Sequence, residues 1–500
     1  MNRGVFAFTT CKERPMKKEP KKFDFAKKVL KASKVKPTFF ALLAGVALLA
    51  VGSAATAQTS AAKPESGTGM ISIIDVAPAT YLGMLRYPKF FGDPNMDRAT
   101  VDGPLGERQY LLGSLGGARD TWVKNGFLVD GGITQAWQGA VSGPGDSSRY
   151  YGSADLWLGL DTGRAGLWSG GLVFAHIEGN WGHIVQGTGA LLPLNFDTTM
   201  PGAPSRAALS ELYLFQGLPN EFAAIVGKVN WSAYADTNLF ANDERNQFMY
   251  VGLVNNPILG AFVPYTSLGG GLFKQFRADL GAGIVITSNN TNALSAGFDE
   301  VSASTMTYGL AGTWTPKLSG RPGMYALLAG YTTKNTTSFD VDKRYLLGEI
   351  LGAVPVAQKD GNYALAFSAS QYLWVDGAAR RSDGKPVGIG PFFRFGLAPK
   401  DRNVIDQFYS LGVGGYGGLF GRSNDNWGVG WARTHFSSDL RGLVEGLGAR
   451  VDASEDVVEA FYNIAITPAV RIALDLQYIN SANPARDNAT VLGTRLQLDF

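Results

Sequence analysis

The chain has 500 residues and a single cysteine, Cys11, which excludes internal disulfides and, once residues 1–57 are removed, thiol catalysis. Its formal net charge is +3, but residues 1–57 hold 12 Lys/Arg and 3 Asp/Glu, which leaves 33 basic and 39 acidic residues, a net charge of −6, in the rest. That acidic balance argues against a nucleic-acid partner, for which clustered positive charge is the signature.

The N-terminal 57 residues have the pattern of a secretory signal peptide. A lysine-rich stretch precedes thirteen uncharged residues, Phe39–Val51, and the small residues Ala55-Thr56-Ala57 follow as a cleavage site. Thirteen residues are too few for the roughly 20 that a membrane-spanning helix needs. No other segment reaches 18 consecutive apolar residues, which leaves a closed β-barrel as the only spanning fold. We therefore expect cleavage before Gln58.

Residues 58–126 are expected to form an N-terminal segment in the periplasm. Gln58–Pro78 is small and polar, and the stretch that follows it lacks the alternation of a strand. Ala118–Asn125, followed by Gly126, has the pattern of a short helix with a glycine cap.

From Phe127 to Phe500 the chain alternates between short strand-like runs and turns. Sixteen strands are predicted, over Phe127–Gln138, Tyr150–Asp161, Gly166–Glu178, Leu209–Gln216, Ala223–Val229, Gly269–Arg277, Gly281–Ser288, Thr305–Thr315, Gly323–Thr333, Tyr363–Trp374, Gly388–Leu397, Phe408–Phe420, Asn426–Thr434, Val457–Ile466, Val470–Ile479 and Thr490–Phe500. An even number fits a transmembrane barrel with both termini in the periplasm. The connections are unequal, since Thr467-Pro468 is tight whereas Thr333–Asn362 and Phe436–Asp456 are long. Short periplasmic turns and long external loops are typical of such barrels.

The last predicted strand has two different faces. Every second residue back from Phe500 is apolar or Thr, and the intervening face carries Asp499, Gln497 and Arg495. A strand of a soluble sheet would also alternate, but the signal peptide and the terminal aromatic favour one face in lipid and one in a polar lumen. The fold class that we predict is an all-β, transmembrane antiparallel β-barrel of about 16 strands, preceded by a short helix-containing segment.

From about residue 110 to 500 the chain resembles the carbohydrate-selective porin (OprB-like) family. Four segments carry the likeness, namely Leu112–Phe127, Tyr151–Gly171, Ser210–Lys228 and Val458–Phe500. The resemblance implies a passive barrel through which sugars cross the outer membrane, with Phe500 read by the barrel-assembly machinery. Two positions depart from the family pattern, because Asn230 and Phe215 stand where acidic residues are usual, and both lie near the expected constriction.

Inward-facing charges are the candidate pore-lining and substrate-path residues: Glu211, Lys228, Asp236, Arg394, Glu459, Arg471, Asp475 and Arg495. Charges of both signs in a water-filled pore create a transverse field and offer hydrogen bonds to sugar hydroxyls. The alternative is that these groups pair across the wall and only hold the barrel in shape.

The connection Val229–Leu268 is predicted to fold inward and narrow the pore. Its polar stretch Asp236–Gln247 carries the hydrogen-bonding groups that a sugar path needs, and connections of this length are usually functional. The alternative is an external loop that shields the mouth of the barrel.

Other chemistry is weakly indicated. Gly412, Gly414 and Gly417 form a GxGxxG pattern without the helix that a dinucleotide site needs, so no cofactor is expected. The run from His435 to Asp439 (HFSSD) leaves a lipase-like barrel enzyme as the alternative, and a structural or adhesion barrel as a third. His176 and His183 have no spacing for a metal. The expected partners are mono- or oligosaccharides, small solutes and outer-membrane lipid, and the choice between monomer and homo-oligomer stays open.

Overall fold

The computed structural model describes residues 70–73, 99–202, 206–290, 292–298, 301–340, 357–417 and 420–500. The predicted signal peptide, its cleavage site and most of the polar segment after it lie outside these residues. Within residues 99–126, two short helices precede the first strand, α5 (Ala99–Asp102) and α6 (Ala118–Lys124). Helix α6 begins and ends within one residue of the predicted helix.

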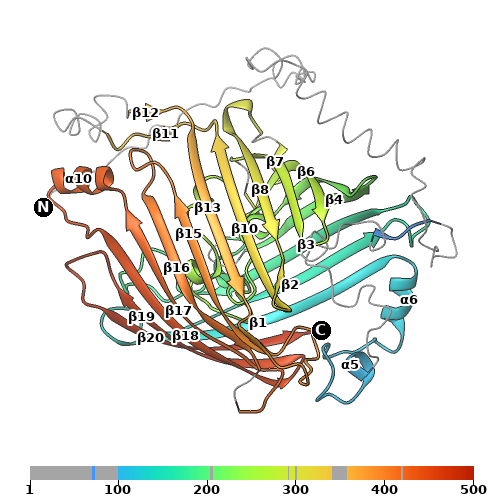
Figure 1. Cartoon of the computed structure of the whole chain (residues 1–500). Helices are drawn as coiled ribbons and strands as arrows, with labels where there is room; N and C mark the ends of the chain where they lie inside the picture. Colours follow the sequence, from blue (N-terminus) through green and yellow to red (C-terminus); the bar gives the residue numbers. More distant parts are fainter. Residues whose placement is uncertain are drawn as a thin grey trace, which may run out of the picture.

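Sixteen antiparallel strands form a closed barrel, as predicted (Figure 1). They are β1 (Phe127–Ser142), β2 (Arg149–Asp161), β3 (Gly171–Gly182), β4 (Ala207–Leu218), β5 (Phe222–Val229), β6 (Ser267–Arg277), β7 (Leu280–Ser288), β8 (Met306–Trp314), β10 (Arg321–Thr332), β13 (Asn362–Gln371), β15 (Gly388–Leu397), β16 (Ile405–Tyr416), β17 (Asn426–Phe436), β18 (Ser454–Thr467), β19 (Val470–Asn480) and β20 (Ala489–Asp499). Short pieces β9 (Lys317–Leu318) and β14 (Trp374–Val375) extend the sheet, and β11 (Thr336–Thr337) pairs with β12 (Gln358–Lys359) outside it.

The barrel closes where β20 pairs with β1. The register runs from Gly132 opposite Asp499 to Ser142 opposite Thr490. Beyond the strand, the amide of Phe500 donates to the Gly131 carbonyl at 2.9 Å, and the Arg119 guanidinium of α6 donates to the Phe500 carbonyl. The C-terminal residue therefore joins the first strand and the preceding helix, so no strand edge is left unpaired at the seam.

The two ends of the barrel differ. Figure 1 shows α10 (Ser438–Gly446) and the paired strands β11 and β12 at one end, and α5, α6 and the C-terminus at the other. We name these the loop end and the turn end. The connections at the turn end are mostly short, such as 468–469 and 219–221, whereas 183–206, 230–266 and 437–453 at the loop end are long. This is the asymmetry that the sequence predicted.

The outer wall carries the apolar alternate residues of the strands. In β19, Leu474, Leu476 and Tyr478 are exposed, while Arg471, Asp475 and Gln477 on the other face are buried. The same division recurs in β8, where Leu310 is exposed and Thr307 is buried. Among the described residues, no helix is both long and apolar enough to cross a bilayer. The exposed apolar face of the strands is the surface that suits lipid.

Leu474→Arg tests that assignment. Leu474 lies on the outer face in the middle of β19, where burying a charge in hydrocarbon is expected to cost about 2–4 kcal/mol of folding free energy in lipid. Urea titration of folding into vesicles measures the cost. The matched control is Asn480→Arg, on the same face at the end of the strand, where the cost is about 0–1 kcal/mol. Equal costs at the two positions would contradict a lipid-facing outer wall.

Candidate pore constriction

In the part of the chain that the structure describes, two long connections from the loop end fold into the barrel interior. The predicted inward course of the connection between β5 and β6 is confirmed, and its narrowing of the pore stays a prediction. Residues 230–266, here named the long inward loop, pack against the inner wall and contain α7 (Ser232–Ala235), α8 (Val251–Val254) and η2 (Leu259–Ala261). The connection between β3 and β4 also enters, over its described residues 183–202, a course that the sequence does not predict. It is named the short inward loop, and within it η1 spans Asp197–Thr199.

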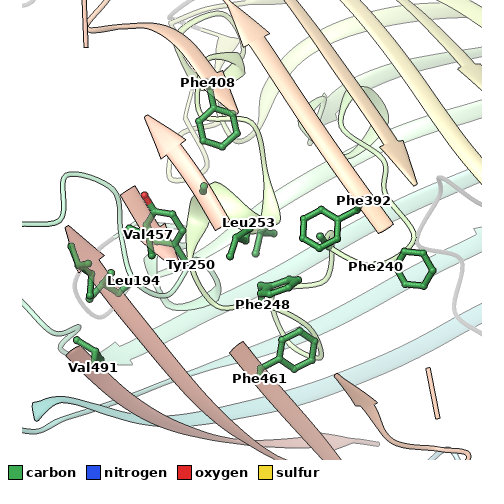
Figure 2. Close-up of a cluster of buried hydrophobic side chains, with 14 of the residues drawn as sticks. Leu194, Phe240, Phe248, Tyr250, Leu253, Phe392, Phe408, Val457, Phe461 and Val491 are labelled. Carbon is green, nitrogen blue, oxygen red and sulfur yellow. The ribbon is translucent and has the colours of Figure 1, made fainter. Parts of the chain in front are cut away.

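Aromatic packing fixes the long inward loop against the wall. Figure 2 shows Phe240 and Phe248 of the loop beside Phe392 and Phe461, which project from β15 and β18. The Phe248 ring lies 4.8 Å from that of Phe461 and 5.5 Å from that of Phe392, in edge-on geometry. Leu194 of the short inward loop belongs to the same cluster. Both loops are therefore parts of one packed core within the barrel.

Glycine on the inner wall makes room for these rings. A Cβ at Gly414 would lie 2.6 Å from the Cβ of Phe240, and one at Gly428 would lie 2.7 Å from the Phe248 ring. Neither distance is tolerable between carbon atoms, so a larger residue at either position would displace the loop. Gly414 belongs to the GxGxxG pattern, and here it lies within a strand.

Basic residues of the wall anchor the long inward loop. The fully buried Arg394 of β15 donates to Asp236 at 2.6 Å and to the carbonyls of Leu253 and Val254. Arg495 of β20 donates to the carbonyls of Glu244 and Gln247, both at 2.8 Å.

The remaining predicted residues have similar surroundings. Glu459 accepts hydrogen bonds from the amides of Met249 and Tyr250, and Glu211 accepts from that of Asn230. Arg471 donates to the side chain of Asn246 at 3.3 Å, and Asp475 is buried close to Glu459 and Arg495. Lys228 instead donates to three carbonyls, those of Leu209, Ala293 and Ser295.

A cavity of about 390 Å³ lies between the inward loops and the wall. Its charged lining consists of Asp155, Glu178, Asp197, Glu244 and Arg245, and its other polar lining includes Asn230, Asn238 and Asn242. Phe196 and Tyr265 add aromatic surface. The cavity reaches Ala278, Thr315 and Met324 toward the turn end. These charged residues differ from the eight that the sequence indicated.

Arg245 is the centre of this lining. Its guanidinium is 3.0 Å from Asp155, 3.3 Å from Glu244 and 3.7 Å from Asp197. The same group lies 4.6 Å from the centre of the Trp157 ring, a cation–π contact. One cation from the long inward loop thus meets carboxylates from β2, from its own loop and from the short inward loop.

The sequence carried a partial signal for these residues. Asp155 and Glu178 lie on predicted strands and face each other across β2 and β3, so the alternation of the inner face could have identified them. Arg245 and Glu244 lie within the polar stretch that was singled out. Asp197 belongs to an irregular connection, for which no periodicity exists.

A buried histidine and two carboxylates form the one arrangement in the described part of the chain with the spacing of a metal site. Ligand atoms of Asp155, His176 and Glu178 lie within 4.8 Å of one another. Neighbouring strands bring them together, which spacing along the sequence did not reveal. Their atoms already have partners, since His176 lies 2.8 Å from Asp155 and 3.4 Å from Glu211, and Tyr265 donates to Glu178. A cation would have to displace these contacts.

The long inward loop is also braced from the turn end. The connection 372–387 folds back so that Arg381 and Lys385 lie 4.8 and 4.9 Å from the centre of the Tyr416 ring. The Tyr416 hydroxyl in turn donates to the Leu239 carbonyl of the long inward loop at 2.9 Å. Residues from both ends of the barrel therefore hold the loop in place.

Comparison with known proteins identifies the family. The model of the carbohydrate-selective porin, OprB family, matches residues 147–500. The chain belongs to this family. Porin B of Pseudomonas aeruginosa is 25% identical over 209 residues, which are 37% of this chain and 44% of that protein, so the match spans less than half of the relative.

Solved structures agree on the fold. The high-pH structure of Pseudomonas putida OprB has a TM-score of 0.68 at 19% identity, over 78% of this chain and 98% of that one. Its low-pH structure has a TM-score of 0.52 at 16% identity, over 79% and 99%. Family and fold together place this OprB-family barrel in the bacterial outer membrane.

Arg394→Ala tests the anchoring of the long inward loop. Removing the guanidinium leaves Asp236 buried without its counter-charge, which is expected to cost about 3–5 kcal/mol of stability. The temperature at which the barrel unfolds on a heat-modifiability gel should fall. Arg149→Ala, which breaks the exposed pair with Asp146, is the control and should leave that temperature nearly unchanged. Equal falls would contradict an anchoring role.

The charge of the cavity should depend on pH through Asp197, which lies outside the spanning strands. Burial raises the pKa of Asp197 to about 7, opposed by Arg245 and assisted by Asp155 and Glu244, with Ser153 as hydrogen-bond donor. The group is neutral below this pKa and charged above it, so raising the pH from about 6 to about 8 adds negative charge. We expect K⁺ conductance in dilute KCl to rise over this range, and Asp197→Asn to flatten the rise. If the conductance of Asp197→Asn rises with pH as in the unchanged protein, Asp197 is not the group whose charge controls the conductance.

Proposed function

We propose that this barrel is a passive porin for sugars and other small hydrophilic solutes. The observation that carries the proposal is the cavity beside the long inward loop. Its amides, carboxylates and guanidinium offer many donors and acceptors for hydroxyl groups, and Phe196 and Tyr265 offer flat apolar faces for sugar rings. The name of the family and that of Porin B point in the same direction.

In this proposal the predicted pore residues act mainly through the loop. The constriction is held at its width by six of them, namely Glu211, Asp236, Arg394, Glu459, Arg471 and Arg495. The surrounding wall is stabilised by Lys228 and Asp475. The solute contacts the charged residues that line the cavity, namely Asp155, Glu178, Asp197, Glu244 and Arg245. Passage is passive and follows the concentration gradient. Hydroxyl groups exchange water for wall contacts of similar strength, so a solute can leave the cavity as readily as it enters.

We also infer the placement of the chain. Residues 1–57 are removed on export, residues 58–126 lie in the periplasm, and the barrel from residue 127 is inserted by the assembly machinery, with Phe500 as part of its recognition signal. The seam supports the last point, since Phe500 joins both β1 and α6.

A barrel enzyme is the weaker alternative. Nδ1 of His435 lies 2.7 Å from Asp406, a pairing with which hydrolases orient an imidazole. The nearby Ser437 hydroxyl, however, donates to the Lys400 carbonyl and accepts from the Leu440 amide as the N-cap of α10. That hydroxyl is engaged in holding a helix, which favours a channel over a hydrolase.

Arg245→Ala tests the proposed solute path. Loss of the guanidinium widens the cavity and removes its strongest donor, so we expect a higher single-channel conductance and weaker block by added sugar. Planar-bilayer recording with glucose and maltose as blockers measures both. Arg245→Lys, which keeps the charge without the planar fork, should give intermediate block. Arg321→Ala, at the exposed start of β10, is the control. Unchanged sugar block in Arg245→Ala would remove the cavity from the path.

A further inference from the structure

Four basic side chains of the inner wall form hydrogen bonds that hold loops and neighbouring strands in place. Arg394 and Arg495 are bound by carbonyl oxygens of the long inward loop, Lys228 by three carbonyls, and Arg471 by an asparagine. These four residues are buried, with exposed fractions of 0 to 6%. None of them belongs to the lining of the cavity. Arg394 is paired with the carboxylate of Asp236, and the other three donate to oxygen atoms that carry no formal charge, so all four side chains are held away from the cavity.

The acidic side chains are distributed differently. Four carboxylates line the cavity, those of Asp155, Glu178, Asp197 and Glu244, against the single guanidinium of Arg245. They come from both inward loops and from two neighbouring strands, so they surround the space from several directions. Behind them His176 lies between Asp155 and Glu211, which adds a further carboxylate to the region.

We infer that the constriction selects by charge, favouring neutral and cationic sugars and excluding anionic ones such as sugar acids and sugar phosphates. This deepens the proposed function and rests on it for the choice of sugars as solutes. Rings of Asp and Glu side chains are the general means by which pores prefer cations. A narrow space with low-dielectric walls concentrates such a field, so a small excess of carboxylates has a large effect on permeation.

The first experiment measures ions alone and does not depend on sugar transport. The purified barrel is placed in a planar bilayer under a KCl gradient at low ionic strength, where screening is weak. We expect a reversal potential that indicates several-fold preference for K⁺ over Cl⁻ at pH 8. The double variant Glu178→Gln/Glu244→Gln should bring the two permeabilities close together. Glu244→Gln alone, which leaves the wall intact, should give part of this loss.

The matched control removes a carboxylate elsewhere. Glu107→Gln changes an exposed residue of the segment before α6, and it should leave the reversal potential where it is in the unchanged protein. A reversal potential that favours Cl⁻ in the unchanged protein would overturn the inference. So would a K⁺ preference that Glu107→Gln lowers as much as the double variant does.

The second experiment compares sugars of one size and different charge. Swelling of vesicles that contain the barrel is followed with glucose, glucosamine and glucuronate. We expect glucosamine and glucose to enter several-fold faster than glucuronate, and the double variant to narrow the gap. Equal entry of glucuronate and glucose would overturn the inference. If no sugar enters while K⁺ preference persists, the proposed function fails but the charge selection stands.

Discussion

Every part of this molecule depends on one requirement: a strand in lipid must have both of its edges paired. An unpaired backbone group in hydrocarbon costs several kcal/mol, so the sheet has to close on itself. Closure here joins β1 to β20, and the terminal residue continues the pairing as far as Gly131. Sixteen strands, however, enclose a space that wall side chains alone do not fill. The inward loops follow from that surplus of space.

Filling the lumen requires that backbone-rich loops be buried in a polar interior. Their carbonyls and amides need partners, and long side chains from the wall supply them. Arg394 and Arg495 satisfy carbonyls, while Glu459 satisfies two consecutive amides. Apolar contacts also hold the loop, because Phe240 and Phe248 pack against aromatic rings of the wall and against the backbone of its glycines. The shape of the pore is therefore a consequence of how the loop is held.

Much of the fold could be predicted from the sequence, because period-two alternation with lipid on one side is a local signal. β19 and β20 have such alternation, and so does β8. The inward course of residues 230–266 could be predicted from length and polarity, but that of residues 183–206 could not, because its burial depends on distant partners such as Gln477. The charged residues that face the lumen could be identified from the alternation along each strand. The alternation does not tell which of them bind a loop and which line the cavity, because that depends on the path of the loop in three dimensions. For that reason two arginines with the same side chain differ in role: Arg394 anchors the long inward loop, whereas Arg245 lines the cavity.

The anchors of the long inward loop carry a consequence for the order of events during folding. Each anchoring contact joins the loop to a residue much later in the chain. Arg394 follows Asp236 by 158 residues, and Glu459 follows Met249 by 210 residues. Arg495 follows Glu244 by 251 residues. Contacts so distant in the chain form late, because the ends of a long segment must first be brought together. The loop is made before the strands that hold it, and its last anchor belongs to the strand that seals the barrel. The pore thus acquires its final width only at the moment when the wall becomes complete.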